Sequence, residues 1–269
     1  MDDKTEVDVL AHNRQSWNEQ SRGGDSPWCQ PADVQTIAQA RAGQWEVILT
    51  PLINVPKKWF GEIRDKRVLC LASGGGQQVP ILSAAGAHVT SFDNSDEQLA
   101  KDKLVADREG LDIKLVQGDM TDLSQFQDGQ FDLIFHPISN IFAQDVRTVW
   151  RECYRVLVDE GRLLSGFMNP DYYLFDHDAL DAGEPAIIRH KLPYSDLDNL
   201  SENELKQHVE KQHALEFSHS LDEQIGGQIE AGFIIAGFYE DRWSDEATPL
   251  NAYMPTSMAT LAIKDSGVN

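Results

Sequence analysis

The sequence predicts an α/β fold of three layers, in which a mostly parallel central sheet of about seven strands carries helices on both faces. From residue 67 onward, short apolar runs alternate with amphipathic helical segments, which is the pattern of parallel sheets. A glycine-rich stretch directly follows the first apolar run, as it does in nucleotide-binding α/β folds. The 269 residues, 41% of them hydrophobic, are enough to fill one large core.

The elements follow in order along the chain. Apolar residues at helical spacing between Val34 and Leu49 predict a helix there, until Pro51 breaks the pattern. Strands are expected at residues 67–71, 88–92, 112–116, 131–135, 161–167, 232–239 and 257–264. Helices are expected at residues 78–85, 96–108, 145–157 and 221–231. The last helix contains Gly226 and Gly227, each of which costs about 1 kcal/mol relative to alanine in a helix.

The composition limits the partners and the location. Lys and Arg number 23 against 44 Asp and Glu, and the resulting net charge of −21 argues against DNA or RNA as a partner. No run approaches the roughly 20 apolar residues of a membrane helix, and the charged start MDDKTEVDVL lacks the apolar segment of an export signal. Cys29, Cys70 and Cys153 form no CxxC pair, which favours a reducing cytoplasm over disulfides or a zinc site.

The stretch CLASGGGQQVP at residues 70–80 is the first candidate binding feature. Three successive glycines let the chain adopt positive φ and let a ligand approach the bare backbone. Pro80 is tolerated only in the first turn of a helix, so the next helix is expected to begin near Gln77 or Gln78. The free N–H groups at that helix start would then face an anionic group.

The spacing of the glycines separates two ligand classes. A dinucleotide-binding G-x-G-x-x-G motif starting at Gly74 would place Val79 where a small residue is needed. The spacing A/G-x-G-x-G fits residues 72–76 instead. With this spacing the stretch resembles the class I S-adenosylmethionine (SAM)-dependent methyltransferases.

The resemblance extends in order over roughly residues 65–170. In this family an acidic residue ends the second strand, and Asp93 stands there, 17 residues beyond Gly76. Another acidic residue follows the third strand, and Asp119 matches it. The strand FDLIF at 131–135, and an RVL helix end followed by G-x-L at 155–163, complete the pattern.

The resemblance implies a Rossmann-like methyltransferase fold with SAM as cofactor and S-adenosyl-L-homocysteine as product. Asp93 would bind the ribose hydroxyls, Asp119 would accept from the adenine amine, and the Met120 N–H would serve a ring nitrogen. The expected cofactor-binding residues are Ala72, Gly74, Gly75, Gly76, Gln77, Asp93, Asn94, Asp119, Met120 and His136. For each aspartate, a plain surface turn is the alternative interpretation.

Two positions depart from the family pattern. Cys70 stands where the family has Asp or Glu, and Ala72 stands where it has glycine. The acidic residue generally supports the loop and the amino end of SAM. In this chain the partner of the SAM amino group must therefore be another residue. Gln77 or Gln78 could supply replacement polar atoms, or face solvent. We interpret Cys70 itself as a core residue, because a thiol is a poor acceptor that prefers burial.

The sequence says less about the residues that would bind the substrate that accepts the methyl group. His136, at the end of the fourth strand, is the candidate general base, with structural packing at the strand end as the alternative. The stretch HPISN at 136–140 differs from the N/D-P-P-Y/F motif of nucleic-acid and protein amino methyltransferases, which favours a small-molecule substrate. No metal-ligand spacing is present, so no metal is expected. Expected substrate-binding residues are Trp17, Asn140, Tyr172 and Tyr194.

We therefore predict one methyltransferase domain over residues 1–269. Its parts are a helical N-terminal cap (1–62), a SAM-binding half (63–170), an inserted segment that covers the substrate (171–220) and a C-terminal part of the sheet (221–269). The alternatives are an NAD(P)-dependent reductase on a related sheet and a SAM- or nucleotide-binding protein without catalysis. The oligomeric state is not indicated by any feature of the sequence.

Overall fold

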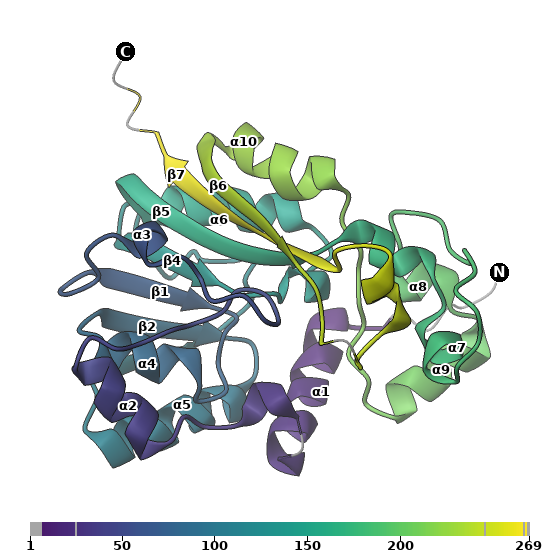
Figure 1. Ribbon diagram of the computed structural model, residues 1–269, viewed down its shortest axis with the longest axis horizontal. Coiled ribbons are helices and arrows are strands. Elements are labelled where there is room, and N and C mark those ends of the chain that lie inside the picture. The colour runs from purple at the N-terminus through teal and green to yellow at the C-terminus, as the bar shows by residue number, and fades with distance from the viewer. Residues whose placement is uncertain (1–6, 25, 245, 266, 268–269) are drawn as a thin grey trace.

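A seven-stranded sheet with the order β3-β2-β1-β4-β5-β7-β6 forms the centre of the protein (Figure 1). The computed structural model describes residues 7–24, 26–244, 246–265 and 267. The first six residues of the charged N-terminus therefore lie outside the described residues. The strands are β1 (Arg67–Leu71), β2 (His88–Asp93), β3 (Ile113–Gln117), β4 (Phe131–His136), β5 (Leu157–Met168), β6 (Phe233–Asp241) and β7 (Ser257–Lys264).

The strand pairing places the binding edge. β1 pairs in parallel with both β2 and β4. The strands β2 and β3 are added on one side of β1 and β4 on the other, so the order of the strands reverses at this point. β7 is antiparallel to both of its neighbours, β5 and β6. In sheets of this kind, ligands bind beyond the carboxyl ends of the strands at the point where the order reverses. The seven predicted strands and the mostly parallel α/β fold are confirmed.

Helices cover both faces of the sheet, because side chains of β1 alternate between two cores. Val68 and Cys70 pack with the helices at 34–41 and 78–84 in one core, whereas Leu69 and Leu71 pack with the helix at 146–156 in the other. The helices that carry these layers are α2 (Val34–Arg41), α4 (Gln78–Ala84), α5 (Asp96–Glu109), α6 (Val146–Val156) and α10 (Gly227–Ala231). No described helix is both long and apolar enough to cross a membrane.

Two predicted helices differ from the structure. The helix expected to run to Leu49 ends at Arg41, because Gly43 adopts a positive φ of 84° and turns the chain. Trp45 then packs edge-on against Phe60 instead of continuing a helical face. The predicted helix 221–231 is divided into a π-helical turn (Asp222–Gly226) and α10. A Cβ on Gly227 would lie 2.9 Å from Cδ1 of Trp150, so glycine permits this close packing.

The N-terminal helix and the inserted segment meet beyond the carboxyl ends of the strands. The helices here are α1 (Val9–Gly23), α7 (His177–Asp181), α8 (Asp196–Asn199) and α9 (Glu202–Glu210), and α3 (Lys57–Phe60) lies apart from them (Figure 1). Asn13 of α1 donates to the carbonyl of Leu215 at 2.9 Å, and Ser16 donates to that of Gln212 at 2.6 Å. These contacts join segments that are about 200 residues apart in the chain.

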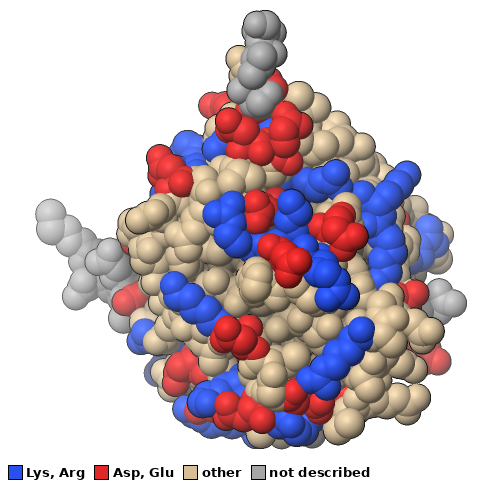
Figure 2. Space-filling view, turned by 90° about the vertical axis from the view of Figure 1, so that its left-hand side faces the viewer, with Lys and Arg blue, Asp and Glu red and all other residues tan. Residues whose placement is uncertain are grey.

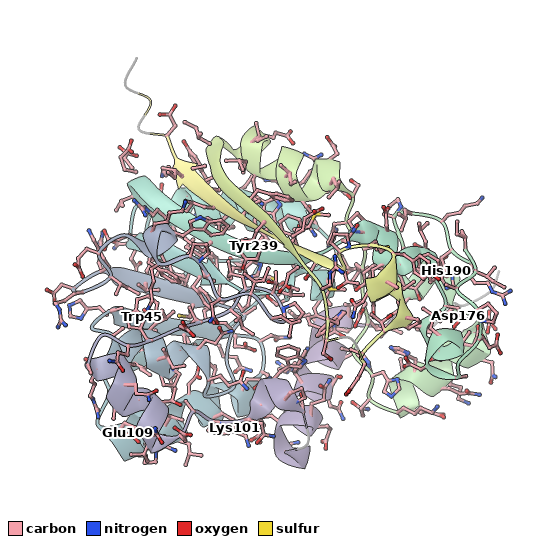
Figure 3. All side chains as sticks on the ribbon, viewed as in Figure 1. Trp45, Lys101, Glu109, Asp176, His190 and Tyr239 are labelled. Atoms are coloured by element: carbon pink, nitrogen blue, oxygen red, sulfur yellow. The ribbon has the colours of Figure 1, made fainter. Side chains whose placement is uncertain are left out.

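The opposite end of the molecule carries interspersed charges. Figure 2 shows Lys and Arg side chains lying next to Asp and Glu on this face. One such pair joins Arg67 and Asp132 at 2.9 Å, at the beginnings of β1 and β4. Figure 3 shows Trp45 and Glu109 at this end, while Asp176 and His190 lie at the far end among the short helices. The carboxyl ends of the strands are therefore the part of the molecule where a binding site is expected.

Candidate functional site

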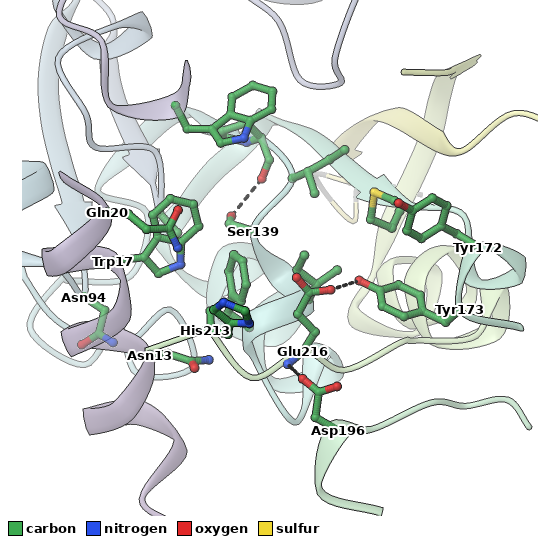
Figure 4. Close-up of a pocket in the computed structure, with 18 of the residues that line it drawn as sticks. Asn13, Trp17, Gln20, Asn94, Ser139, Tyr172, Tyr173, Asp196, His213 and Glu216 are labelled. Carbon is green, nitrogen blue, oxygen red and sulfur yellow. Dashed lines mark hydrogen bonds between the residues drawn. The ribbon is translucent and has the colours of Figure 1, made fainter. Parts of the chain in front are cut away.

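A cavity of about 980 Å³ lies beyond the carboxyl ends of β1 to β4 (Figure 4). Its walls come from the loops after these strands, from α1 and from the segment 172–216. The predicted site residues that line it are Trp17, Ala72, Gly74, Gln77, Asp93, Asn94, Asp119, Met120, Tyr172 and Tyr194. The predicted residues Gly75, Gly76, His136 and Asn140 are not part of its lining.

Asp93 ends β2 and holds the glycine loop as well as lining the cavity. Its Oδ2 accepts from the Gly74 N–H at 3.0 Å, and its Oδ1 accepts from the Ser95 N–H at 2.9 Å. Each carboxylate oxygen can accept a second hydrogen bond, so both keep capacity for a ligand diol. Burial raises the pKa of Asp93 to about 6, even though the two N–H donors oppose this shift.

Asp119 and Met120 follow β3 on the same side of the cavity. The Asp119 carboxylate accepts from the Thr121 N–H at 2.9 Å and from the Thr121 hydroxyl at 2.6 Å. These bonds fix the carboxylate at the cavity wall and still leave acceptor capacity on both oxygens. Asn94, on the neighbouring loop, donates to the Leu10 carbonyl of α1 at 3.0 Å, which connects this wall to the N-terminal helix.

The N–H groups of the glycine loop donate to protein acceptors. The Gly75 N–H donates to the Gln98 carbonyl at 3.1 Å, and the Gly76 N–H donates to Asp102 Oδ1 at 2.8 Å. A Cβ on Gly75 would lie 2.5 Å from the Trp28 carbonyl oxygen. These glycines are thus needed for close packing against α5 and the N-terminal segment, so Gly75 and Gly76 do not face the cavity.

The two glutamines after the loop also bond to the protein backbone. Gln77 donates through Nε2 to the Pro27 carbonyl, and Gln78 Oε1 accepts from the Ile48 N–H at 2.5 Å. The helix begins at Gln78 with Pro80 in its first turn, which confirms the predicted helix start. Both side chains connect the loop to the N-terminal part of the chain. Both glutamines also line the cavity.

His136 does not face the cavity, contrary to our expectation. Because side chains alternate along β4, His136 points with Ile134 toward α6, and its ring lies edge-on to Trp150 at 6.0 Å. Its Nδ1 donates to the Leu71 carbonyl at 3.0 Å, since a carbonyl can only accept. The ring is fully buried, and burial lowers its pKa to about 4. In this orientation His136 cannot reach a ligand in the cavity, either as a base or as a cofactor contact.

Asn140 is also turned away from the expected substrate side. It is fully buried, and its Nδ2 donates to Gln224 Oε1 at 2.9 Å. The short 3-10 turn that contains it (Asn140–Phe142) directs Asn140 toward the π-helical turn of 222–226. The neighbouring Ser139, Ile141 and Phe142 line the cavity in its place.

The end of the cavity away from Asp93 is lined by tyrosines and carboxylates, and we name it the tyrosine lobe. Its defining residues are Tyr172, Tyr173, Tyr194, Asp196 and Glu216. The Tyr173 hydroxyl donates to Glu216 Oε2 at 2.7 Å (Figure 4), and the Tyr194 hydroxyl donates to Asp196 Oδ1 at 2.7 Å. The Glu216 N–H donates to Asp196 Oδ2 at 2.7 Å. The lobe therefore holds two neighbouring carboxylates in fixed positions.

Two of the five residues that define the lobe are acidic, and none of the five is Lys or Arg. Burial raises the pKa of Glu216 to about 7, and the nearby Asp196 charge adds to this effect. Among the described residues, the basic side chain that reaches these carboxylates is His208, whose Nε2 lies 3.7 Å from Asp196 Oδ2. No group of three or more His, Cys, Asp or Glu in the described part of the chain is arranged to hold a metal ion.

Aromatic side chains close the cavity on the N-terminal side. Trp17 of α1 lines the cavity and packs edge-on against Phe142 at 5.3 Å. Trp28 also lines it and packs against Trp243 at 5.9 Å. Trp45 lies at the other end of the molecule (Figure 3). The cover thus combines residues from the N-terminal and C-terminal parts of the chain.

Comparisons with known proteins agree with this geometry. A family described as "Methyltransferase domain" matches residues 69–165, which contain the glycine loop and the ends of β2 and β3. The Bacillus subtilis protein named "Uncharacterized methyltransferase YbaJ" is 46% identical over 256 residues, covering 95% of this chain and 98% of that protein. The chain belongs to the SAM-dependent methyltransferase family.

Other similar proteins match a smaller part of the chain or have a lower sequence identity. The sterol 24-C-methyltransferase erg-4 of Neurospora crassa is 33% identical over 105 residues, which are 38% of this chain and 27% of that protein. The crystal structure of a SAM-dependent methyltransferase from Mesorhizobium loti has a TM-score of 0.57 at 18% identity, over 77% of this chain and 95% of that chain. It shows the shared fold. The family membership overturns the reductase alternative and identifies the protein as an enzyme rather than a non-catalytic binding protein.

The cofactor end of the cavity fits the SAM that the family implies. Ser73 Oγ and Gln98 Oε1 are buried polar atoms without a hydrogen-bond partner among the described residues, and both residues line the cavity beside the glycine loop. Buried polar atoms are usually paired, so unpaired ones at a cavity wall suit a polar ligand. The adjacent Asp93 and Asp119 carboxylates add acceptors for hydroxyl and amino groups.

Proposed function

We propose that this methyltransferase transfers the methyl group of SAM to a small molecule that carries an amino group. The observation that carries the proposal is the single cavity that joins the cofactor end, at Asp93 and Asp119, to the tyrosine lobe. A cavity of this size admits a cofactor and a small acceptor together. The net charge of −21 supports a small molecule over a nucleic acid.

Residues at the strand ends would bind the cofactor. Asp93 would accept from the ribose hydroxyls, Asp119 from the adenine amine, and the Met120 N–H would donate to a ring nitrogen. Ala72, Gly74, Gln77 and Asn94 would shape the remaining wall. Bound SAM supplies a methyl group that its sulfonium already activates. The protein's part is therefore to align the acceptor and to exclude water.

The tyrosine lobe supports an acceptor with an amino group. Aromatic faces and carboxylates both attract cations, and Glu216 and Asp196 are paired in the described structure with tyrosine hydroxyls rather than with Lys or Arg. An ammonium group must lose a proton before its nitrogen lone pair can attack. Glu216, with a pKa raised to about 7, is suited to take that proton on its carboxylate.

The cover of the cavity supports the exclusion of water. Trp17 from α1 and Tyr172 from the inserted segment line the cavity from different sides. Tyr172 stacks on His177 at 3.9 Å, and His177 Nε2 donates to the Tyr172 carbonyl at 2.9 Å, so these contacts hold this side of the cover in place.

We place the reaction in the cytoplasm, which is supported by three buried cysteines that form no disulfide.

Binding and transfer measurements test the proposal separately. Isothermal titration of the full chain with SAM, S-adenosylhomocysteine and NADH should show binding of the first two. Binding of NADH without any response to SAM would overturn the cofactor assignment. Labelled SAM is then supplied with small amines, alcohols, thiols and carboxylic acids. We expect labelled amines; transfer confined to the other classes would overturn the acceptor class and leave the methyltransferase function standing.

A further inference from the structure

The position of the family's acidic residue on β1 is occupied by a thiol that cannot replace it. Cys70 is fully buried and aligned in the sheet with Ser91 of β2. Burial, and then the charge of Asp102, raises the pKa of the Cys70 thiol, so the thiol stays neutral. A neutral thiol is a weak acceptor, and the glycine loop above it needs another support.

A carboxylate from helix α5 lies beside this position. Asp102 is fully buried, and its Oδ2 accepts from the hydroxyl of Ser91, the sheet partner of Cys70, at 2.6 Å. Its Oδ1 accepts from the Gly76 N–H at 2.8 Å. One carboxylate thus connects Ser91, which lies beside Cys70 in the sheet, to Gly76 at the end of the glycine loop.

The burial of Asp102 is costly and therefore calls for a reason. Burial raises its pKa to about 7, the Ser91 and Gly76 bonds oppose this shift, and the nearby charge of Asp93 adds to it. A carboxylate exposed to solvent would not have this cost of burial. At this buried position of α5, beside Leu99 and Val105, an apolar side chain would not have it either. What Asp102 provides, and an apolar residue could not, is an acceptor for the loop.

The loop rests on α5 over its whole C-terminal half. The Gly75 N–H donates to the Gln98 carbonyl, one turn before Asp102. Gly76 has a positive φ of 78°, and a Cβ there would lie 2.9 Å from the Lys101 carbonyl oxygen. Helix α5 thus receives two successive N–H groups of the loop, and the second of them depends on a side chain.

We propose that Asp102 is a positioning residue for the cofactor: the acidic support of the glycine loop has moved from the first strand to helix α5, which leaves Cys70 free to pack in the core. Asp102 acts through the loop, because Ala72 and Gly74 of that loop line the cavity and Gly76 does not. The inference rests on the proposed use of SAM and is independent of the acceptor.

Titration with SAM and S-adenosylhomocysteine tests this role in the full chain. Asp102→Ala leaves the buried Gly76 N–H without its acceptor, and we expect the Kd for both ligands to rise by about 10- to 100-fold, because the loss of a buried hydrogen bond to a charged group has effects of this size. Asp107→Ala is the matched control on the exposed side of α5, where Asp107 pairs with Lys103. Its Kd should stay within about twofold of that of the unsubstituted protein.

Moving the acid back separates positioning from general stability. In the double variant Cys70→Asp with Asp102→Ala, the carboxylate returns to β1, and we expect SAM affinity to recover at least tenfold relative to Asp102→Ala. A merely structural role would predict no such recovery, because the double variant carries one more core substitution. Equal or weaker binding by a folded double variant would overturn the proposal.

A milder variant covers the case in which Asp102→Ala does not fold. Asp102→Asn keeps the shape of the side chain and one oxygen, but removes the charge. We expect a smaller loss of SAM affinity together with faster hydrogen exchange in peptides over 72–80. Unchanged affinity and unchanged exchange would overturn the proposal. Failure of the unsubstituted protein to bind SAM would overturn the proposed function as well, whereas normal binding unaffected by Asp102 variants would overturn this inference alone.

Discussion

The cofactor end and the tyrosine lobe share one cavity but are built differently. At the cofactor end, Asp93 is the last residue of β2 and Asp119 lies two residues after β3, so the strand register itself places both carboxylates. In the lobe, Glu216 is placed by contacts between distant segments. Its neighbour Phe217 forms an isolated bridge with Ser195, and the Phe217 N–H donates to the Ile141 carbonyl at 2.8 Å.

This difference separates a general task from a specific one. Every SAM-dependent enzyme of this fold binds the same ribose and adenine, and two strand ends are enough to position the acceptors for them. The acceptor substrate differs between enzymes, and a segment of short helices inserted after β5 can change without disturbing the sheet. Substitutions at the two ends should therefore have separable effects on cofactor binding and on acceptor binding.

The largest expected effect is at the cofactor end. Asp93→Ala removes the proposed acceptor for two ribose hydroxyls and also the partner of the Gly74 N–H. Hydrogen bonds to a charged group contribute about 1.5–3 kcal/mol each, so the Kd for SAM should rise by at least about 100-fold. Titration calorimetry measures this change. Asp112→Ala, an exposed aspartate before β3, is the control, and SAM affinity equal to that of this control would refute the ribose assignment.

The next effect is confined to the lobe. Glu216→Gln keeps the size of the side chain but removes the charge that would bind and deprotonate an amine. We expect kcat/KM for the amine acceptor to fall by about 10- to 100-fold, with the Kd for SAM unchanged. Steady-state kinetics and calorimetry measure the two quantities, with Glu204→Gln at the cavity wall as control. A parallel loss of SAM affinity would show that the two ends are not separable.

The pH dependence of SAM binding distinguishes the ends again. The pKa of Asp93 is raised to about 6, so protonation begins at a higher pH than for an ordinary carboxyl group and removes acceptor capacity as the pH falls. From about pH 7.5 to about pH 5, the Kd for SAM should rise by about tenfold. Burial, together with the nearby charge of Asp93, raises the pKa of Asp102 to about 7, so protonation of Asp102 acts in the same direction. A pH-independent Kd would contradict the role of Asp93.

The smallest effect tests the loop backbone. Ala72 has a positive φ of 47°, a conformation that costs an alanine about 1–2 kcal/mol and costs glycine little. Ala72→Gly should therefore raise the free energy of unfolding by up to about 1 kcal/mol, which denaturant titration can measure. Ala100→Gly, at an exposed position within α5, should lower it by about 1 kcal/mol instead. A loss of stability with Ala72→Gly would show that the loop is not strained there.

The sequence predicted the strands of the sheet, but it did not predict which way some side chains at the strand ends point. His136 was placed at the correct strand end, but strand alternation turns it toward Trp150, and the Ile134 on the same face already indicated this. Asp102 had a signal that we missed, since it shares the apolar face of its helix with Leu99 and Val105. Glu216 had no such signal, because its surroundings come from segments far away in the chain.

The sequence by itself determined where the strands of the cofactor half lie along the chain and which carboxylates stand at the ends of β2 and β3, because apolar periodicity and turn residues act locally. Only the tertiary structure decided how the glycine loop is supported and what lines the lobe. The Gly76 N–H finds its acceptor 26 residues away on α5, and Tyr173 finds Glu216 at a distance of 43 residues. Such pairs depend on how helices pack on the sheet, and no local pattern contains that information.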